Sequence, residues 1–130
     1  MQTLNRQMTN ICSPNLPASR DFYTQLFDFN VDYDSDWFVL ISKDKNLELG
    51  IIDVNSDLVP ADFQNTPNGF YITFVVKNVD NVYEIAKSEG YDIISEPTDT
   101  FYGQRRLLLK DPNDALVDVS APIPNFNFGN

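Results

Sequence analysis

Histidine is absent from this chain of 130 residues, and cysteine and tryptophan occur once each. Imidazole is a frequent metal ligand and the usual general base near neutral pH. Its absence removes histidine-based metal sites and leaves no histidine to activate a serine or cysteine nucleophile. The single Cys12 excludes an intrachain disulfide and favours a reducing compartment, so we expect a cytoplasmic protein.

Basic residues and long hydrophobic runs are also scarce. Lys and Arg number 9 against 19 Asp and Glu, which gives a formal net charge of −10. Such a surface repels nucleic acid and anionic lipid, and it favours cationic or neutral partners. No segment approaches the roughly 20 apolar residues of a membrane-spanning helix, and residues 1–10 lack the apolar core of a signal peptide. We expect neither a nucleic-acid partner nor a membrane partner.

What the chain does contain is an internal repeat, in which one strand, one helix and three strands occur in the same order twice. The first half is predicted to form a strand at 8–13, a helix at 16–27 and strands at 29–33, 37–42 and 47–53. The second half is predicted to form a strand at 70–76, a helix at 79–88 and strands at 91–95, 105–110 and 115–119.

This order predicts an α+β fold in a single domain, residues 1–130. Its first module covers about 6–53, a Pro-containing linker covers 54–68, the second module covers about 69–121, and a tail covers 122–130. Asn78 is suited to capping the second helix and Gly90 to ending it. Asp28 is expected to take a left-handed conformation after the first helix, and Asn113-Asp114 to form a tight turn.

Several motifs resemble those of the vicinal oxygen chelate superfamily, which includes glyoxalase I, extradiol dioxygenases and bleomycin-resistance proteins. They are Leu16-Pro17-Ala18-Ser19-Arg20-Asp21-Phe22-Tyr23 in the first helix, Phe27-Asp28-Phe29-Asn30-Val31 after it, and Tyr102-Gly103-Gln104-Arg105-Arg106 before Asp111-Pro112-Asn113. The resemblance extends from about residue 10 to residue 121. It implies two βαβββ modules that form a curved mixed sheet around a concave groove, in a protein that forms a two-fold dimer.

The same resemblance places the family's metal-ligand positions at Met8, Glu48, Tyr71 and Asp118. A slip of the first strand would move the first position to Gln7 or Asn10. Thioethers suit Cu(I), whereas carboxylates suit Mg²⁺, Ca²⁺ or Mn²⁺, so these residues form a poorly matched donor set. We expect no cofactor; the alternative is a divalent metal held by Glu48 and Asp118.

Strand alternation and loop position indicate which side chains line the groove. Alternation turns Leu47, Leu49 and Ile51 toward the first helix and the intervening residues toward the groove. Aromatic residues beside loops are candidates for stacking on a ligand, whereas Phe38 is expected in the core. The predicted ligand-binding residues are Trp37, Glu48, Gly50, Tyr71, Tyr102 and Asp118.

The preferred interpretation is a metal-independent small-molecule-binding protein that resembles the bleomycin-resistance branch. It would confer antibiotic resistance by sequestering a cationic or aromatic compound. The alternative is a divalent-metal-dependent lyase, dioxygenase or thiol transferase, and a third interpretation is a protein-interaction module with a vestigial groove. In the expected homodimer, Tyr71 and Asp118 of one subunit could meet Glu48 of the other. Aromatic residues of the linker and tail, Phe63, Phe126 and Phe128, would lie at the contact.

Overall fold

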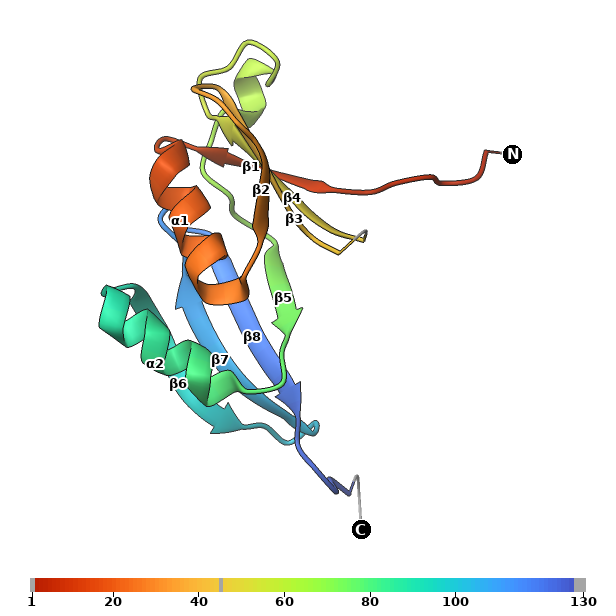
Figure 1. The fold of residues 1–130 in the computed structure, drawn as a ribbon, viewed down its shortest axis with the longest axis vertical. Helices are drawn as coiled ribbons and strands as arrows, with labels where there is room; N and C mark the ends of the chain where they lie inside the picture. Colours follow the sequence, from red (N-terminus) through yellow and green to blue (C-terminus); the bar gives the residue numbers. More distant parts are fainter. Residues whose placement is uncertain (1, 45, 128–130) are drawn as a thin grey trace. The chain divides into compact units, whose positions relative to one another are not determined.

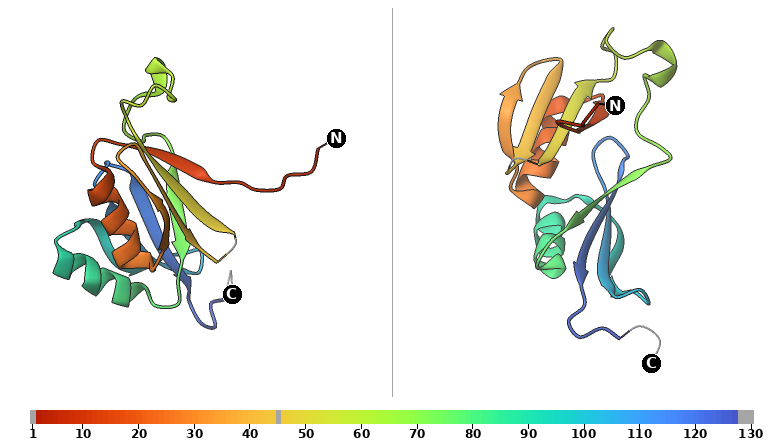
Figure 2. Two further views of the ribbon diagram at one scale, coloured as in Figure 1. Left: turned by 45° about the horizontal axis from the view of Figure 1, so that its top comes forward. Right: turned by 90° about the vertical axis from the view of Figure 1, so that its right-hand side faces the viewer.

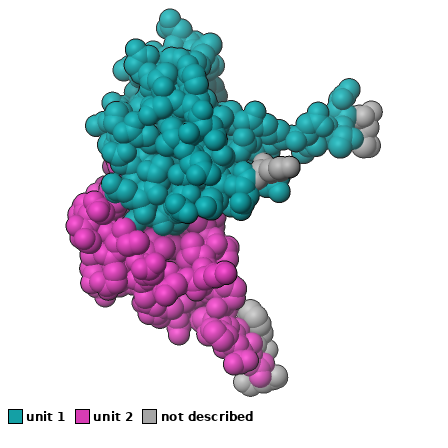
Figure 3. All heavy atoms as spheres, viewed as in Figure 1, with its two compact units in different colours: residues 1–67 teal, residues 68–130 magenta. Residues whose placement is uncertain are grey.

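The computed structural model contains two compact units, residues 1–67 and 68–130 (Figure 3). It describes residues 2–44 and 46–127. Each unit follows the order strand, helix, strand, strand, strand, and its helix covers one face of its own four-stranded mixed sheet (Figures 1 and 2). The predicted α+β fold of two βαβββ modules is therefore confirmed. None of the described helices is long and apolar enough to cross a membrane.

In unit 1 the sheet order is β1-β4-β3-β2, with β1 parallel to β4 and the other pairs antiparallel. A short 3₁₀ helix, η1, lies in the predicted linker. The elements are β1 (Thr9–Ser13), α1 (Leu16–Phe27), β2 (Asn30–Asp34), β3 (Phe38–Lys43), β4 (Leu47–Asp53) and η1 (Ala61–Phe63).

Unit 2 repeats this topology with the sheet order β5-β8-β7-β6, and β5 is parallel to β8. Its elements are β5 (Tyr71–Val75), α2 (Val79–Glu89), β6 (Asp92–Asp99), β7 (Gln104–Lys110) and β8 (Leu116–Pro122). Strand β6 is longer than predicted and contains Pro97. An edge strand tolerates proline because only one side of it needs ladder donors, and the register of β6 shifts on both sides of Ser95.

The core of each unit lies between its helix and the inner face of its sheet. Helix α1 buries one apolar face against β3 and β4, and α2 packs on β6, β7 and β8. The buried apolar residues of β3, β4, β7 and β8 occupy every second position, as period-2 geometry requires; they include Val39, Ile41, Leu49, Ile51, Leu107, Leu109, Val117 and Val119. Leu47 differs from the prediction: it is exposed, because it begins β4 beside the loop after β3.

Local capping explains where the helices begin and end. The side chain of Asn78 accepts a hydrogen bond from the backbone N–H of Asn81, and Gly90 ends α2 with φ 75°. After α1, Asp28 takes the left-handed conformation with φ 57°. These three predictions are confirmed.

The turn between β7 and β8 depends on Asp111, which is buried. Its Oδ1 accepts hydrogen bonds from the backbone N–H groups of Asn113 and Ala115, both at 2.8 Å. Asp114 has φ 66°, so the predicted Asn113-Asp114 turn is present. One carboxylate oxygen thus replaces the backbone acceptors that a regular strand would supply.

Asp111→Ala should lower the free energy of unfolding by about 1–3 kcal/mol, because two buried backbone donors lose their acceptor. Asp111→Asn should recover much of this loss, since its amide oxygen can accept from the same two groups. Urea unfolding of the full chain measures both effects. Asp114→Asn is the matched control, because asparagine tolerates the left-handed conformation and should change stability little; an equal loss in this variant would contradict the assignment.

Candidate functional site

The open face of each sheet, meaning the face opposite its helix, carries most of the predicted site residues. In unit 1, Asn10, Phe38, Glu48 and Gly50 alternate with buried core residues along β1, β3 and β4. In unit 2 the corresponding positions on β5, β7 and β8 are Tyr71, Thr73, Arg106, Asp118 and Ser120.

On the open face of unit 1, Glu48 is bound by the guanidinium of Arg6. Arg6 Nε lies 2.7 Å from Oε2, and its Nη2 also donates to Oε1. The hydrogen bond from Arg6 lowers the pKa of Glu48, and the arginine's charge adds to this. Arg6 Nη2 also lies 3.8 Å from Sδ of Met8. One guanidinium therefore contacts both family ligand positions of this unit.

Unit 2 repeats this arrangement with Asp118 and Arg106. Asp118 is 6% exposed, and its Oδ1 accepts hydrogen bonds from Arg106 Nε at 3.1 Å and from the Ser120 hydroxyl at 2.7 Å. Its Oδ2 accepts from the Thr73 hydroxyl at 2.9 Å. The guanidinium carbon of Arg106 lies 5.8 Å from the centre of the Tyr71 ring. Both ligand positions of unit 2 thus also contact one arginine.

The residues present do not fit a divalent metal. Across residues 2–44 and 46–127, no three Asp, Glu or Cys side chains gather into a potential metal site. The two candidate carboxylates, Glu48 and Asp118, each bind a guanidinium within their own unit. A metal ion at either carboxylate would have to displace that cation, and Met8 and Tyr71 are poor ligands for the hard ions that carboxylates prefer.

Gly50 faces the open side of the sheet but is covered by its neighbours. A Cβ added there would lie 2.1 Å from Asn10 Oδ1 and 3.0 Å from the Phe38 ring. Gly50 therefore supplies the space in which Asn10 and Phe38 lie over the strand. The prediction that Phe38 belongs to the core is wrong. It pairs with Ile52 on the open face, whereas its neighbour Val39 is the buried residue.

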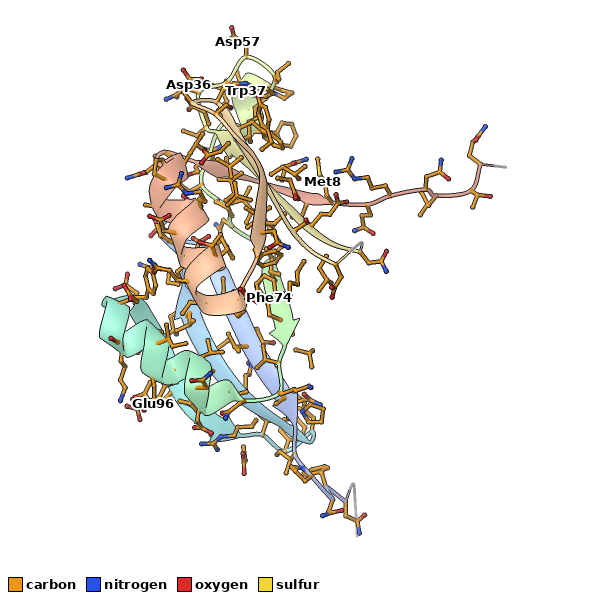
Figure 4. All side chains as sticks on the ribbon, viewed as in Figure 1. Met8, Asp36, Trp37, Asp57, Phe74 and Glu96 are labelled. Atoms are coloured by element: carbon orange, nitrogen blue, oxygen red, sulfur yellow. The ribbon has the colours of Figure 1, made fainter. Side chains whose placement is uncertain are left out.

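Three aromatic side chains of unit 1, Tyr33, Trp37 and Phe38, form what we call the aromatic surface. The rings of Trp37 and Phe38 stack with centroids 5.3 Å apart, and the Tyr33 ring lies 6.5 Å from Trp37 and 6.4 Å from Phe38. Trp37 is 40% exposed and Tyr33 is also exposed. Figure 4 labels Trp37 next to Asp36 in unit 1. This surface therefore offers aromatic area to solvent.

A turn and a bulge bring these rings together. Ser35 closes the turn before β3, since its hydroxyl accepts from the backbone N–H of Phe38 and its own N–H donates to the Phe38 carbonyl. Trp37 lies within this turn, so strand alternation does not separate it from Phe38. The register shift between Val31 and Tyr33 redirects the Tyr33 side chain. Sequence patterns identified Trp37 but missed Tyr33, because a bulge has no clear sequence signal.

Of the predicted residues of unit 2, Tyr71 and Tyr102 are both exposed. The Tyr102 ring lies edge-on to Phe101, with centroids 5.4 Å apart. Burial lowers the pKa of Arg106, but the hydrogen bond and charge of Asp118 outweigh this effect and raise it, so the guanidinium stays protonated. The structure thus groups Tyr71, Arg106 and Asp118 directly, whereas the Tyr102 ring contacts Phe101.

Cys12 is not arranged as a nucleophile. Its Sγ lies 3.7 Å from the carbonyl oxygen of Phe63, and burial raises the pKa of its thiol. A raised pKa reduces the thiolate fraction at neutral pH, and the thiolate is the reactive form. Cys12 lies two positions after Asn10 on β1, so strand alternation places both on the open face of the sheet.

Comparison with known proteins places this geometry in a family. The sequence model of the Glyoxalase/Bleomycin resistance protein/Dioxygenase superfamily matches residues 6–119. A family enzyme from Burkholderia phytofirmans PsJN is 23% identical, with a TM-score of 0.78 over 89% of this chain and 97% of that chain. A superfamily member from Sphaerobacter thermophilus DSM 20745 is 15% identical, with a TM-score of 0.75 over 92% and 98% of the two chains.

Hypothetical protein SA1046 from S. aureus is 19% identical, with a TM-score of 0.74 over 92% of this chain and 95% of that chain. At these identities the structures establish the fold alone. A search of curated proteins finds no match.

Arg6→Ala should raise the pKa of Glu48 toward its ordinary value, because the hydrogen bond that stabilises the carboxylate is lost. Carboxyl-detected NMR titration measures this pKa. The Arg6–Glu48 contribution to stability is present above the pKa that Glu48 has in the unfolded chain. It disappears as the pH falls through the lower folded-state pKa. Arg20→Ala is the control, since Arg20 pairs with Asp21 and Asp34; a Glu48 pKa that moves equally in both variants would contradict the assignment.

Proposed function

The chain belongs to the Glyoxalase/Bleomycin resistance protein/Dioxygenase superfamily, and from this premise we propose that it sequesters a small aromatic compound without a metal cofactor. The aromatic surface of Tyr33, Trp37 and Phe38 is the observation that carries the proposal. The proposed setting is the cytoplasm, and the proposed benefit is resistance to an aromatic antibiotic, by analogy with the bleomycin-resistance branch.

Stacking on an exposed aromatic surface is a physically sufficient basis for weak to moderate binding. Each aromatic pair contributes about 0.5–1.5 kcal/mol beyond the area it buries. The rings of the aromatic surface already contact one another, so little side-chain freedom is lost when a planar ligand binds. Exposed aromatic side chains also leave apolar area in contact with water, and a ligand would cover it.

Of the two predicted ligand classes, cationic and aromatic, local geometry supports the aromatic one more directly. Glu48 and Asp118 each hold an arginine, so their charges are locally compensated. A positive charge on the ligand would still be attracted by the net charge of −10 and by Asp36, which is exposed next to Trp37. Charge therefore aids the approach of a cationic aromatic compound, and ring contact holds it.

Titration with bleomycin-like and other planar aromatic compounds should change the fluorescence of Trp37, which is the sole tryptophan of the chain. Tyr33→Ala should weaken binding about 2- to 10-fold, which corresponds to the loss of one aromatic pair. Phe101→Ala in unit 2 is the matched control, because Phe101 is 90% exposed and lies outside the aromatic surface. Chelator should leave the affinity unchanged. If no neutral or cationic aromatic compound changes the fluorescence of Trp37, the proposal is rejected.

A two-fold homodimer is the second part of the proposal. Phe63 in η1 is 71% exposed, and Phe126 in the tail is half-buried; Phe128 lies outside the described residues. A second copy of the chain would remove such apolar side chains from water.

Light scattering at micromolar concentration should give twice the 14.8 kDa chain mass. Phe63→Ser should shift the equilibrium toward the monomer, whereas Leu58→Ser, another exposed apolar residue of the linker, serves as the comparison. A monomer mass that persists as concentration rises would refute the dimer.

A further inference from the structure

Arg106 differs from the other arginines of the chain in how it uses its donors. Arg6 and Arg20 each donate to carboxylates through Nε and a terminal nitrogen, and Arg105 donates through Nε, Nη1 and Nη2. Arg106 donates to Asp118 through Nε only. Within residues 2–44 and 46–127, its Nη1 and Nη2 have no hydrogen-bond partner.

These terminal donors face solvent from a fixed position. The Arg106 side chain is 26% exposed. No buried side-chain nitrogen or oxygen of the described residues lacks a hydrogen-bond partner, so the unpartnered Nη1 and Nη2 of Arg106 are not buried. Asp118 is itself held by the hydroxyls of Thr73 and Ser120, so it fixes the orientation of the guanidinium. The two carboxylate oxygens of Asp118 accept hydrogen bonds from Thr73, Ser120 and Arg106. These hydrogen bonds reduce the repulsion between Asp118 and a nearby anion.

We propose that Arg106 anchors a carboxylate-binding subsite on the open face of unit 2. The subsite would take an aromatic carboxylate: Nη1 and Nη2 donate to its two oxygens, and Tyr71 contacts its ring. The planar terminal edge of a guanidinium matches a carboxylate in a bidentate pair. Asp118 is a positioning residue, because it acts through Arg106. The inference does not rest on the proposed function, since none of its residues belongs to the aromatic surface of unit 1.

Arg105 provides a matched control within the same strand. It follows Gln104 and precedes Arg106 on β7, so strand alternation places it on the opposite face of the sheet. There it pairs with Asp80 and Asp99, which occupy all three of its side-chain nitrogens. Removing Arg105 removes the same positive charge from the chain but leaves the proposed subsite intact.

Binding of benzoate to the full chain should be followed by NMR of the arginine Nε–H groups and, so that variants without Arg106 can be compared with the parent, of the backbone amides of β5 and β8. Benzoate should shift the Arg106 resonance with a Kd of roughly millimolar size, as expected for so small a ligand. Benzamide, which has the same ring without the charge, and inorganic phosphate should bind at least about 10-fold more weakly. Phosphate binding as tight as benzoate binding would overturn the assignment to an aromatic carboxylate.

Variants locate the subsite. Arg106→Gln should weaken benzoate binding by at least about 10-fold. Arg106→Lys should also weaken it, because lysine keeps the positive charge but lacks the planar pair of terminal N–H donors. Arg105→Gln should bind like the parent. Tyr71→Ala should weaken binding, and Tyr71→Phe should retain it. If Arg106→Gln does not fold, Arg106→Lys still decides the question, because it can still pair with Asp118.

The overturning results are unchanged benzoate binding in both Arg106 variants, equal loss in Arg105→Gln, or no shift at any Arg106 resonance in the parent chain. Repeating the titration in Trp37→Phe separates this inference from the proposed function. Benzoate binding should survive there, so a failure of the Trp37 fluorescence test and a failure of the Arg106 test are distinct outcomes.

Discussion

A guanidinium bound to a carboxylate lies on the open face of each sheet, and the arrangement of both faces depends on this pair. In unit 1 the pair is Arg6 with Glu48, and in unit 2 it is Arg106 with Asp118. The carboxylates occupy corresponding strands, β4 and β8, each of which lies between the parallel first strand and an antiparallel neighbour. A buried carboxylate without a counter-charge would be strongly unfavourable, so Asp118 in particular requires its arginine.

The two arginine–carboxylate pairs have the same chemistry, but they differ in the surrounding contacts that hold them in place. Arg6 comes from the extended segment before β1, its side chain is 57% exposed, and among the described residues no other side chain donates a hydrogen bond to Glu48. Arg106 comes from the middle of β7, and its partner is also held by two hydroxyls. The internal repeat therefore does not produce two equal sites: the pair in unit 2 is built into the sheet, and the pair in unit 1 depends on a terminal segment.

Much of the fold could be predicted from the sequence because its signals are local. The bounds of α1, the cap at Asn78 and the stop at Gly90 depend on residues a few positions apart. Neither arginine pair could be predicted in this way, since Arg6 and Glu48 are 42 positions apart and Arg106 and Asp118 are 12 apart. The face that Phe38 takes could not be predicted, because residues 38–41 are all apolar and alternation alone does not show which of them face the helix.

Arginine and a divalent metal ion differ in what they let a protein do. A metal ion offers open coordination positions and acts as a Lewis acid. A guanidinium supplies a permanent charge and fixed N–H donors, but it has no coordination position and does not give up its proton near neutral pH. Its chemistry is recognition of planar oxyanions and aromatic faces. On this face Arg106 contacts both Asp118 and Tyr71, so it joins fixed N–H donors to an aromatic ring within one unit.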